Sequence, residues 1–221
     1  MSSGSALQAL LASIGFAEIP PDGAIEAQLR KLFVYYCSFG DIGASALLGT
    51  PLPFQQPCHP SRDPISSPAA FSAMLEEGVA SGEIKFTNSG DVGLVCKIYE
   101  RAFLTEMGNA TQLLYYGLQW DDAAGVELCE ALRYAHAHGG LTKLTSLWLY
   151  GNKLGDGFVT SFVALLDEGG LAGVEELHLN NNAISEQGMQ ELAAAIARGG
   201  LPSCTGILLG GNPGSAAPVE E

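Results

Sequence analysis

Three stretches of the chain repeat every thirty residues, and this period constrains the fold more than any other feature. They begin at Leu141, Leu171 and Leu201 and read LTKLTSLWLYGNKL, LAGVEELHLNNNAI and LPSCTGILLGGNPG. In each stretch, apolar residues occupy the same positions and an Asn follows them. A fixed period of this length is typical of a solenoid, in which each unit buries its apolar face against its neighbours. The closing residues are Asn152, Asn182 and Asn212.

Each unit is predicted to be a strand followed by a helix. In L-x-L the two leucines share one face of a strand, so Leu147 and Leu149 point inward and Trp148 points outward. The Asn lies where the chain turns away, and its amide can bond the backbone of neighbouring turns. Helical periodicity follows, with Asp156 and Ser185 as predicted N-caps and the Gly pairs as C-caps. The predicted strands are 146–150, 176–180 and 206–209.

The pattern L-x-x-L-x-x-L-x-L-x-x-N-x-L, followed by a helix, resembles the leucine-rich repeat. The long, helix-containing unit is similar to the ribonuclease-inhibitor-like subclass. The resemblance covers residues 110–214 and implies an α/β solenoid of parallel strands and helices.

A weaker copy of the unit lies upstream, in LLYYGLQWDDAAGVELCEALRYAHAHGG. Its helix positions match, because Leu128 stands thirty residues before Phe158. Its strand positions match poorly: Gly117 and Gln119 take the places of the two leucines, and Asp122 takes the place of the Asn.

The N-terminal half is predicted to be helical. Apolar residues at helical spacing run through 25–39, and a long loop rich in Gly, Pro and Ser follows at 41–68. The stretch ISSPAAFSAMLEEGV predicts a helix that Ser66 or Ser67 caps, with Pro68 in its first turn. The stretch FTNSGDVGLVCKIYERAF predicts another.

This arrangement resembles the EF-hand-like core of the p25-alpha family, the tubulin polymerisation-promoting proteins. The resemblance covers residues 25–103 and depends on the segments from Tyr36 to Asp41 and from Thr87 to Val92. It implies association with microtubules. A calcium-binding EF-hand loop needs closely spaced oxygen ligands and a central Gly, and the sequence has no D-x-[DN]-x-[DN]-G stretch. We therefore expect calcium to bind no tighter than the millimolar range.

The sequence thus predicts a small all-α, EF-hand-like domain followed by an α/β solenoid. Residues 1–24 are predicted to form an N-terminal amphipathic helix or arm, because Leu7, Leu10, Leu11 and Ile14 follow helical spacing. The alternative is a signal or transit peptide, which the absence of Lys or Arg before the apolar middle disfavours. The helical domain spans 25–108 and includes the Pro-rich loop 41–68. The repeats span 109–214, and an acidic tail spans 215–221.

Charge narrows the choice of partner. The chain carries a net charge of −14, and residues 110–221 hold four basic and thirteen acidic side chains. Such a surface repels phosphate backbones and anionic lipid, so we expect neither nucleic acid nor membrane as a partner. It suits a basic protein; alternatively, the acidity only keeps the protein soluble. Five cysteines without C-x-x-C spacing favour a reducing compartment, and we expect a cytoplasmic protein.

A search for catalytic motifs finds none of the common nucleophile, phosphate-binding or zinc-protease patterns. His136 and His138 diverge by about 200 degrees on a helix, which favours an exposed helix end over a metal site. Asp121 and Asp122 suit a helix start, where negative charge meets the positive end of the dipole. We therefore predict no enzyme activity, no cofactor and no metal.

The function is expected to reside on the concave face of the strands, because binding hot spots are enriched in large aromatics such as those found there. The alternative is that a flank of the short solenoid or the N-terminal domain folds over this face and covers it. The predicted protein-binding residues are Ser146, Trp148, Tyr150, Glu176, His178, Asn180 and Leu208.

Two classes of function follow. The first is a non-catalytic scaffold or adaptor that binds a protein through the concave face. The second is a regulator of an enzyme, similar to the Ran-type GTPase activators, or a microtubule-associated protein acting through the p25-alpha-like half. No helix is expected after the strand at 206–209, so this C-terminal edge is predicted to meet a partner, a second copy or further sequence.

Overall fold

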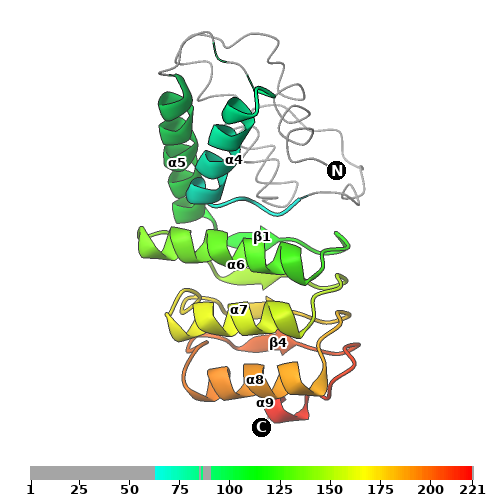
Figure 1. The fold of residues 1–221 in the computed structure, drawn as a ribbon. Helices are drawn as coiled ribbons and strands as arrows, with labels where there is room; N and C mark the ends of the chain where they lie inside the picture. The colour runs from blue at the N-terminus through cyan, green and yellow to red at the C-terminus, as the bar shows by residue number, and fades with distance from the viewer. Residues whose placement is uncertain (1–62, 85, 87–90, 221) are drawn as a thin grey trace, which may run out of the picture.

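The computed structural model describes residues 63–84, 86 and 91–220 (Figure 1). The predicted N-terminal arm, the predicted helix at 25–39 and most of the Pro-rich loop lie outside the described residues. The same holds for most of the motif residues that carry the p25-alpha resemblance.

Helices and short parallel strands alternate through the second half of the chain, so the predicted α/β class is confirmed. All four strands belong to one parallel sheet in the order β1-β2-β3-β4. The strands have three residues each, fewer than predicted. In chain order the elements are α4 (Pro68–Ala80), α5 (Asp91–Asn109), β1 (Gln112–Leu114), α6 (Asp122–Ala137), β2 (Ser146–Trp148), α7 (Asp156–Asp167), β3 (Glu176–His178), α8 (Glu186–Ala197), β4 (Gly206–Leu208) and α9 (Ala217–Glu220).

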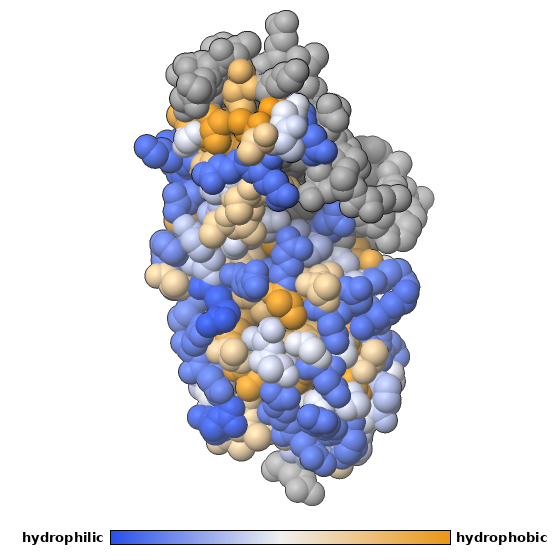
Figure 2. Space-filling model, viewed as in Figure 1, coloured by the Kyte–Doolittle hydropathy of each residue, from blue (hydrophilic) through white to orange (hydrophobic). Residues whose placement is uncertain are grey.

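The helices α6, α7 and α8 stack side by side in one layer in front of the strands (Figure 1). Their outer surface is mostly hydrophilic, with apolar residues scattered between polar ones (Figure 2). Apolar residues on the inner side of these helices meet the inward residues of the strands. Leu147 and Leu177 are among the latter, and both are 0% exposed.

The register between the last three strands follows the sequence period. Leu147 lies beside Leu177, and Leu177 lies beside Ile207, so each step is thirty residues. The step from β1 to β2 is longer, because Leu113 pairs with Leu147 and 147 − 113 = 34. The prediction that Gly117 and Gln119 occupy the two leucine positions of the first unit is therefore wrong. Those positions belong to Leu113 and Tyr115, both 0% exposed.

An extra helical turn explains this shift. Helix α6 has 16 residues and α7 has 12, and both begin with an Asp at the same distance from the preceding strand. Counted from these helix starts, Asp122 corresponds to Asp156 and Leu128 to Phe162. The place of the Asn in the first unit therefore falls at Leu118, and not at Asp122 as predicted.

The helix starts link neighbouring units. Gly155, not Asp156, is the N-cap of α7, so the predicted cap is displaced by one residue. The Asp156 carboxylate instead accepts hydrogen bonds from the Ser185 N–H at 2.9 Å and the Ser185 hydroxyl at 2.5 Å. Asp122 likewise accepts from the N–H groups of Gly155 and Gly157, at 2.5 and 3.1 Å. Ser185 caps α8 as predicted, accepting from the Gln187 N–H.

Glycine ends each of these helices. Gly139, Gly169 and Gly199 have φ of 78°, 78° and 90°, a region that residues with a Cβ rarely adopt. The N–H of Gly140 then donates to the Ala135 carbonyl at 2.8 Å and satisfies a carbonyl at the end of α6. The predicted glycine pairs follow the helix ends, but the C-caps themselves are His138, Glu168 and Arg198, so the predicted caps are displaced by one residue.

The Asn that follows each strand bonds the turns on both sides of it. The Asn152 carbonyl oxygen accepts from the N–H groups of Leu118 and Trp120, at 2.9 and 3.3 Å. Its amide nitrogen donates to the carbonyls of Tyr115 and Leu149, at 2.7 and 2.9 Å. Asn182 and Asn212 each donate to two carbonyls in the same way, and their side-chain oxygens accept from one N–H each, that of Leu154 and that of Ile184.

Helices α4 and α5 extend the core at the N-terminal end. Ser67 caps α4 by accepting from the Ala70 N–H, and Pro68 is its first residue, as predicted. Phe71 on α4 stacks on Tyr99 of α5 with ring centroids 3.9 Å apart. The hydrophobic core continues from these helices into the sheet without a break.

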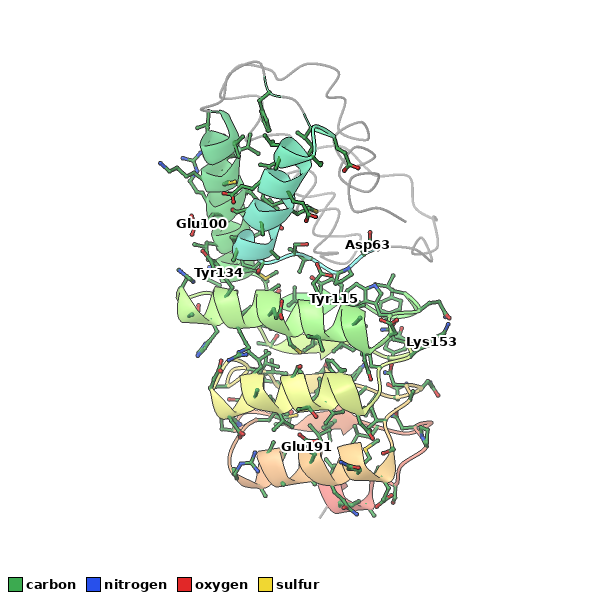
Figure 3. All side chains as sticks on the ribbon, viewed as in Figure 1. Asp63, Glu100, Tyr115, Tyr134, Lys153 and Glu191 are labelled. Atoms are coloured by element: carbon green, nitrogen blue, oxygen red, sulfur yellow. The ribbon has the colours of Figure 1, made fainter. Side chains whose placement is uncertain are left out.

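Three side chains join α5 to α6. The Tyr134 hydroxyl donates to the Glu100 carboxylate at 2.5 Å, and Figure 3 shows Glu100 on α5 close to Tyr134 on α6. This hydrogen bond raises the pKa of Tyr134 to about 12. Phe103 packs edge-on against the Tyr134 ring at 5.9 Å.

The C-terminal end contains a helix that the sequence analysis did not expect. After β4 the chain forms α9, which packs against α8. Its start is fixed by Ser215, whose hydroxyl accepts from the Ala217 N–H and whose N–H donates to Glu186. Ala216 and Val219 pack against the core. The prediction that no helix follows this strand is wrong.

Candidate protein-binding face

The side of the sheet that turns away from α6, α7 and α8 is called the strand face here. Successive side chains of a strand point to opposite sides, so this face receives the residues between the buried leucines. Leu147 and Leu149 are buried against the helices, whereas Trp148 and Tyr150 are partly exposed. The predicted alternation of inward and outward residues therefore holds in β2.

Four rings gather on the strand face and form the aromatic cluster: Tyr116, Trp148, Tyr150 and His178. Trp148 stacks on His178 with centroids 4.8 Å apart and planes at 7°. Tyr116 stacks on Tyr150 at 4.7 Å and 2°. These spacings match the separation of about 4.7–4.9 Å between paired strands. The register thus produces the stacks, because it places rings at the same height on neighbouring strands.

The two stacks also contact each other. The rings of Tyr116 and Trp148 lie 6.5 Å apart, and those of Tyr150 and His178 lie 6.4 Å apart. Such distances are within the range of favourable tilted aromatic pairs. The four rings therefore form one surface and not two separate pairs.

Sequence reasoning found three members of this cluster and missed Tyr116. The residue lies just after β1, where the assumed thirty-residue step aligned it with Ser146 instead of Tyr150. The signal was present in the sequence as LLYY, in which Leu113 and Tyr115 alternate with Leu114 and Tyr116. A step of 34 residues would have aligned Tyr116 with Tyr150.

Two buried polar atoms lie beside the cluster without a hydrogen bond. They are the indole nitrogen of Trp148 and the side-chain oxygen of Asn180, and neither has a partner among the described residues. Trp148 lies beside His178 on the neighbouring strand, and Asn180 follows His178 by two residues. Because a buried polar atom without a partner costs free energy, this part of the strand face is not fully satisfied by the described contacts.

The other predicted residues lie around the cluster, with one correction. Glu176 is exposed, and Leu208 on the last strand is 50% exposed. Ser146 is only 5% exposed, so it does not offer a surface to a partner as predicted. Its short side chain lies between the larger Gln112 and Glu176 at the same height on neighbouring strands.

Two arginines on the helix side of the sheet form ion pairs there. On the helix side, the Arg133 guanidinium donates to both oxygens of Glu168 and lowers the pKa of that carboxyl. Arg198 donates to both oxygens of Asp167, at 2.9 and 2.8 Å. Glu176, by contrast, is an exposed carboxylate on the strand face. Glu176 therefore places a negative charge on the strand face.

The residues considered for chemistry make structural contacts. His136 Nε2 lies 3.0 Å from the Glu168 carbonyl, and His138 Nδ1 lies 2.8 Å from the Tyr134 carbonyl. Asp121 is the N-cap of α6, as the helix-start interpretation predicted. Within residues 63–84, 86 and 91–220 there is no group of three His, Cys, Asp or Glu that could hold a metal ion.

The chain matches no known protein-family model, and no curated protein is significantly similar to it in sequence. None of the helices in the described part of the chain is both long and apolar enough to cross a membrane.

Proposed function

We propose that the chain is a leucine-rich-repeat protein of the ribonuclease-inhibitor-like subclass and acts as a non-catalytic scaffold that binds a protein through its strand face. The steps of thirty residues between the last three strands support the proposed family. So do the helix after each strand and the hydrogen bonds of Asn152, Asn182 and Asn212 to neighbouring turns.

The aromatic cluster is the observation that carries the binding proposal. Trp and Tyr dominate binding hot spots because they offer a large contact area with few rotatable bonds. Here the rings are already held in stacks at 4.7 and 4.8 Å, so little side-chain entropy remains to be lost when a partner binds.

The charge of the chain favours a basic partner. The net charge is −14, and Glu176 adds a negative group next to the aromatic cluster. A complementary surface would be attracted at long range, and its association rate would fall as salt concentration rises.

The proposed compartment is the cytoplasm. Cys96, Cys129 and Cys204 are free thiols in the structure. Burial raises the pKa of Cys129 to about 12, so this thiol stays protonated and unreactive. Free thiols of this kind are typical of a reducing environment.

A comparison of two double variants tests the proposal. Trp148→Ala with His178→Ala removes one stack of the aromatic cluster, and Glu130→Ala with Gln190→Ala changes two exposed residues on the helix side. Affinity capture from a lysate of the source cells should recover a protein with the wild type and the helix-side variant but not with the cluster variant. Equal recovery by both variants would show that the strand face is not the binding surface.

The two alternative functions, a regulator of an enzyme and a microtubule-associated protein, stay predictions. Acceleration of GTP hydrolysis by a small GTPase would favour a Ran-type activator. Co-sedimentation with polymerised tubulin would favour the p25-alpha-like function.

A further inference from the structure

Each strand of the sheet bonds the next one through the same backbone groups. The Leu149 N–H donates to the His178 carbonyl, and thirty residues later the Leu179 N–H donates to the Leu208 carbonyl, both at 2.8 Å. At the start of the strands, the Thr145 carbonyl accepts from two N–H groups of the next unit. The Glu175 carbonyl does the same, from Thr205 at 2.9 Å and Gly206 at 3.0 Å.

The last strand presents these groups without a partner. The Asn181 N–H likewise donates to the Gly210 carbonyl. Counting thirty residues further, the corresponding groups in and beside β4 are the N–H of Leu209, the N–H of Gly211 and the carbonyl of Thr205. None of them forms a hydrogen bond with another residue of the described chain. The edge of β4 therefore displays the same pattern of donors and acceptors that β2 and β3 use to bind a following strand.

Side chains at this edge are also incompletely covered. Ile207 and Cys204 occupy inward positions, yet both are partly exposed. The corresponding residues of the preceding unit, Leu177 and Val174, are 0% exposed. On the strand face Leu208 is 50% exposed, and Leu94 is the only other exposed large hydrophobic residue among those described.

The helix layer differs from the sheet at this end. Helix α9 packs against α8, and its residue Val219, together with Ala216 just before the helix, packs against the core there. The place that a following helix would take is thus partly filled (Figure 1). What stays open is the sheet edge, which fits a single extended segment better than another strand–helix unit.

Charge selects among extended segments. The chain carries a net charge of −14, and the exposed Glu175 and Glu176 lie just before and at the start of β3, the strand next to β4. A second copy of the chain would bring two like-charged ends together, whereas a basic segment would be attracted. We infer that β4 is a docking edge for an extended, basic segment of a partner protein, which adds to the sheet as a fifth, parallel strand. This inference does not depend on the aromatic cluster.

Synthetic peptides provide the probe. The peptide LAGVEELHLNNN copies residues 171–182, which already form such a strand in this sheet. In the second peptide, LAGVKKLHLNNN, both Glu are replaced by Lys. Fluorescence anisotropy with labelled peptides should show saturable binding of the basic peptide to the full chain. Because of the charge, this peptide should bind at least about threefold more tightly than the acidic one at low salt.

Methylation of single backbone amides tests strand addition directly. In the sheet the Glu176 N–H donates back to β2, whereas the Leu179 N–H donates forward to β4. Alternate amides of a strand point the same way, so the His amide of the basic peptide faces β4 and the amide of the following Leu faces away. N-methylation at the His should weaken binding at least about tenfold, and N-methylation at that Leu should change it little.

A matched pair of protein variants locates the site. Leu208→Lys places a like charge against the basic peptide at β4, and Leu94→Lys makes the same change at the exposed position on α5. Leu208→Lys should weaken binding at least about tenfold, and Leu94→Lys should leave it unchanged. Both changes are at exposed positions, so thermal unfolding should show that both variants are folded.

Three results would overturn the inference. They are the absence of saturable binding, equal effects of the two methylations, and equal effects of the two Lys substitutions. Sedimentation without peptide adds a fourth: a dimer that Leu208→Lys dissociates and that excludes the peptide would assign the edge to a second copy instead. None of these results tests the aromatic cluster. The proposed scaffold function would therefore still be tested separately, by the lysate capture.

Discussion

The unit that begins with β3 and the unit that begins with β4 have the same strand pattern but different surroundings. Leu177 in the first is 0% exposed, whereas Ile207 at the corresponding position is partly exposed. The first strand leads to a helix of 12 residues and the second to one of four. An L-x-L pattern therefore sets which way a side chain points, but the neighbouring units decide whether it becomes buried.

The difference extends to hydrogen bonds. The carbonyl of Leu179 accepts from both Asn182 and Asn212, whereas the Leu209 carbonyl accepts from Asn212 alone. Stability in such an array is approximately a sum of unit and neighbour terms. Substitutions at matched positions of the two units should thus have different costs, and each comparison below tests this expectation.

The largest difference is expected for the inward residues. Leu177→Ala should lower the free energy of unfolding by roughly 2–5 kcal/mol, since it removes a fully buried side chain between two units. Ile207→Ala should cost about half as much or less, because water already reaches that residue. Urea unfolding of both variants measures the difference. Equal losses would mean that the edge is covered in solution.

The Asn residues should show a smaller difference in the same direction. Asn182 is buried, and its amide accepts from the Leu154 N–H and donates to the carbonyls of Leu149 and Leu179. Asn182→Ala should cost about 1–3 kcal/mol, because these backbone groups would be left buried without partners. Asn212→Ala should cost less, since water can replace its bonds at the half-buried edge. The midpoint of chemical unfolding distinguishes the two, and a larger loss for Asn212→Ala would contradict the comparison.

The sequence predicted features that the local pattern determines, but not those that depend on packing against neighbouring elements. The inward leucines and the parallel pairing followed from an exact period, and the cap formed by Ser67 followed from local chemistry. Helix α9 could not be predicted, because four residues do not form a stable helix in isolation and this one depends on packing against α8.

The predictions of the first unit and of the binding face were partly wrong for a related reason. One additional turn in α6 breaks the period between Leu113 and Leu147, so a fixed step of thirty residues misplaced the strand and hid Tyr116. Ser146 shows the remaining limit: alternation assigned it to the correct face, but only the sizes of Gln112 and Glu176 on either side explain why it is buried.

Outward residues should follow the same trend with smaller effects. His178→Ala should cost about 0.5–1.5 kcal/mol, the range for loss of an aromatic pair, because it removes the stack on Trp148. Leu208→Ala should change stability by no more than about 0.5 kcal/mol, since its side chain is half exposed. Thermal unfolding checks both values. A cost for His178→Ala equal to that of Leu177→Ala would show that the assignment of inward and outward residues is wrong.

The smallest effect is expected at the opposite end of the array, where the segment before α4 contacts α6. The Ser66 hydroxyl donates to the Glu127 carboxylate at 2.8 Å, and partial burial raises the pKa of Glu127 despite this bond. A raised pKa means that the folded state binds the proton more tightly than the unfolded state. Glu127 therefore lowers stability as pH rises from below its ordinary pKa through the raised value, and this loss stays at neutral pH.

Glu127→Gln keeps an acceptor for Ser66 and removes the charge, so it should raise Tm slightly at pH 7 and leave it nearly unchanged near pH 3. Glu76→Gln, at an exposed position on α4 and not among the charges that act on Glu127, is the control and should show no such pH-dependent gain. A lower Tm for Glu127→Gln at pH 7 would mean that the bond with Ser66 outweighs the burial of the charge. The junction would then resemble the well-bonded interior of the array more than its open edge.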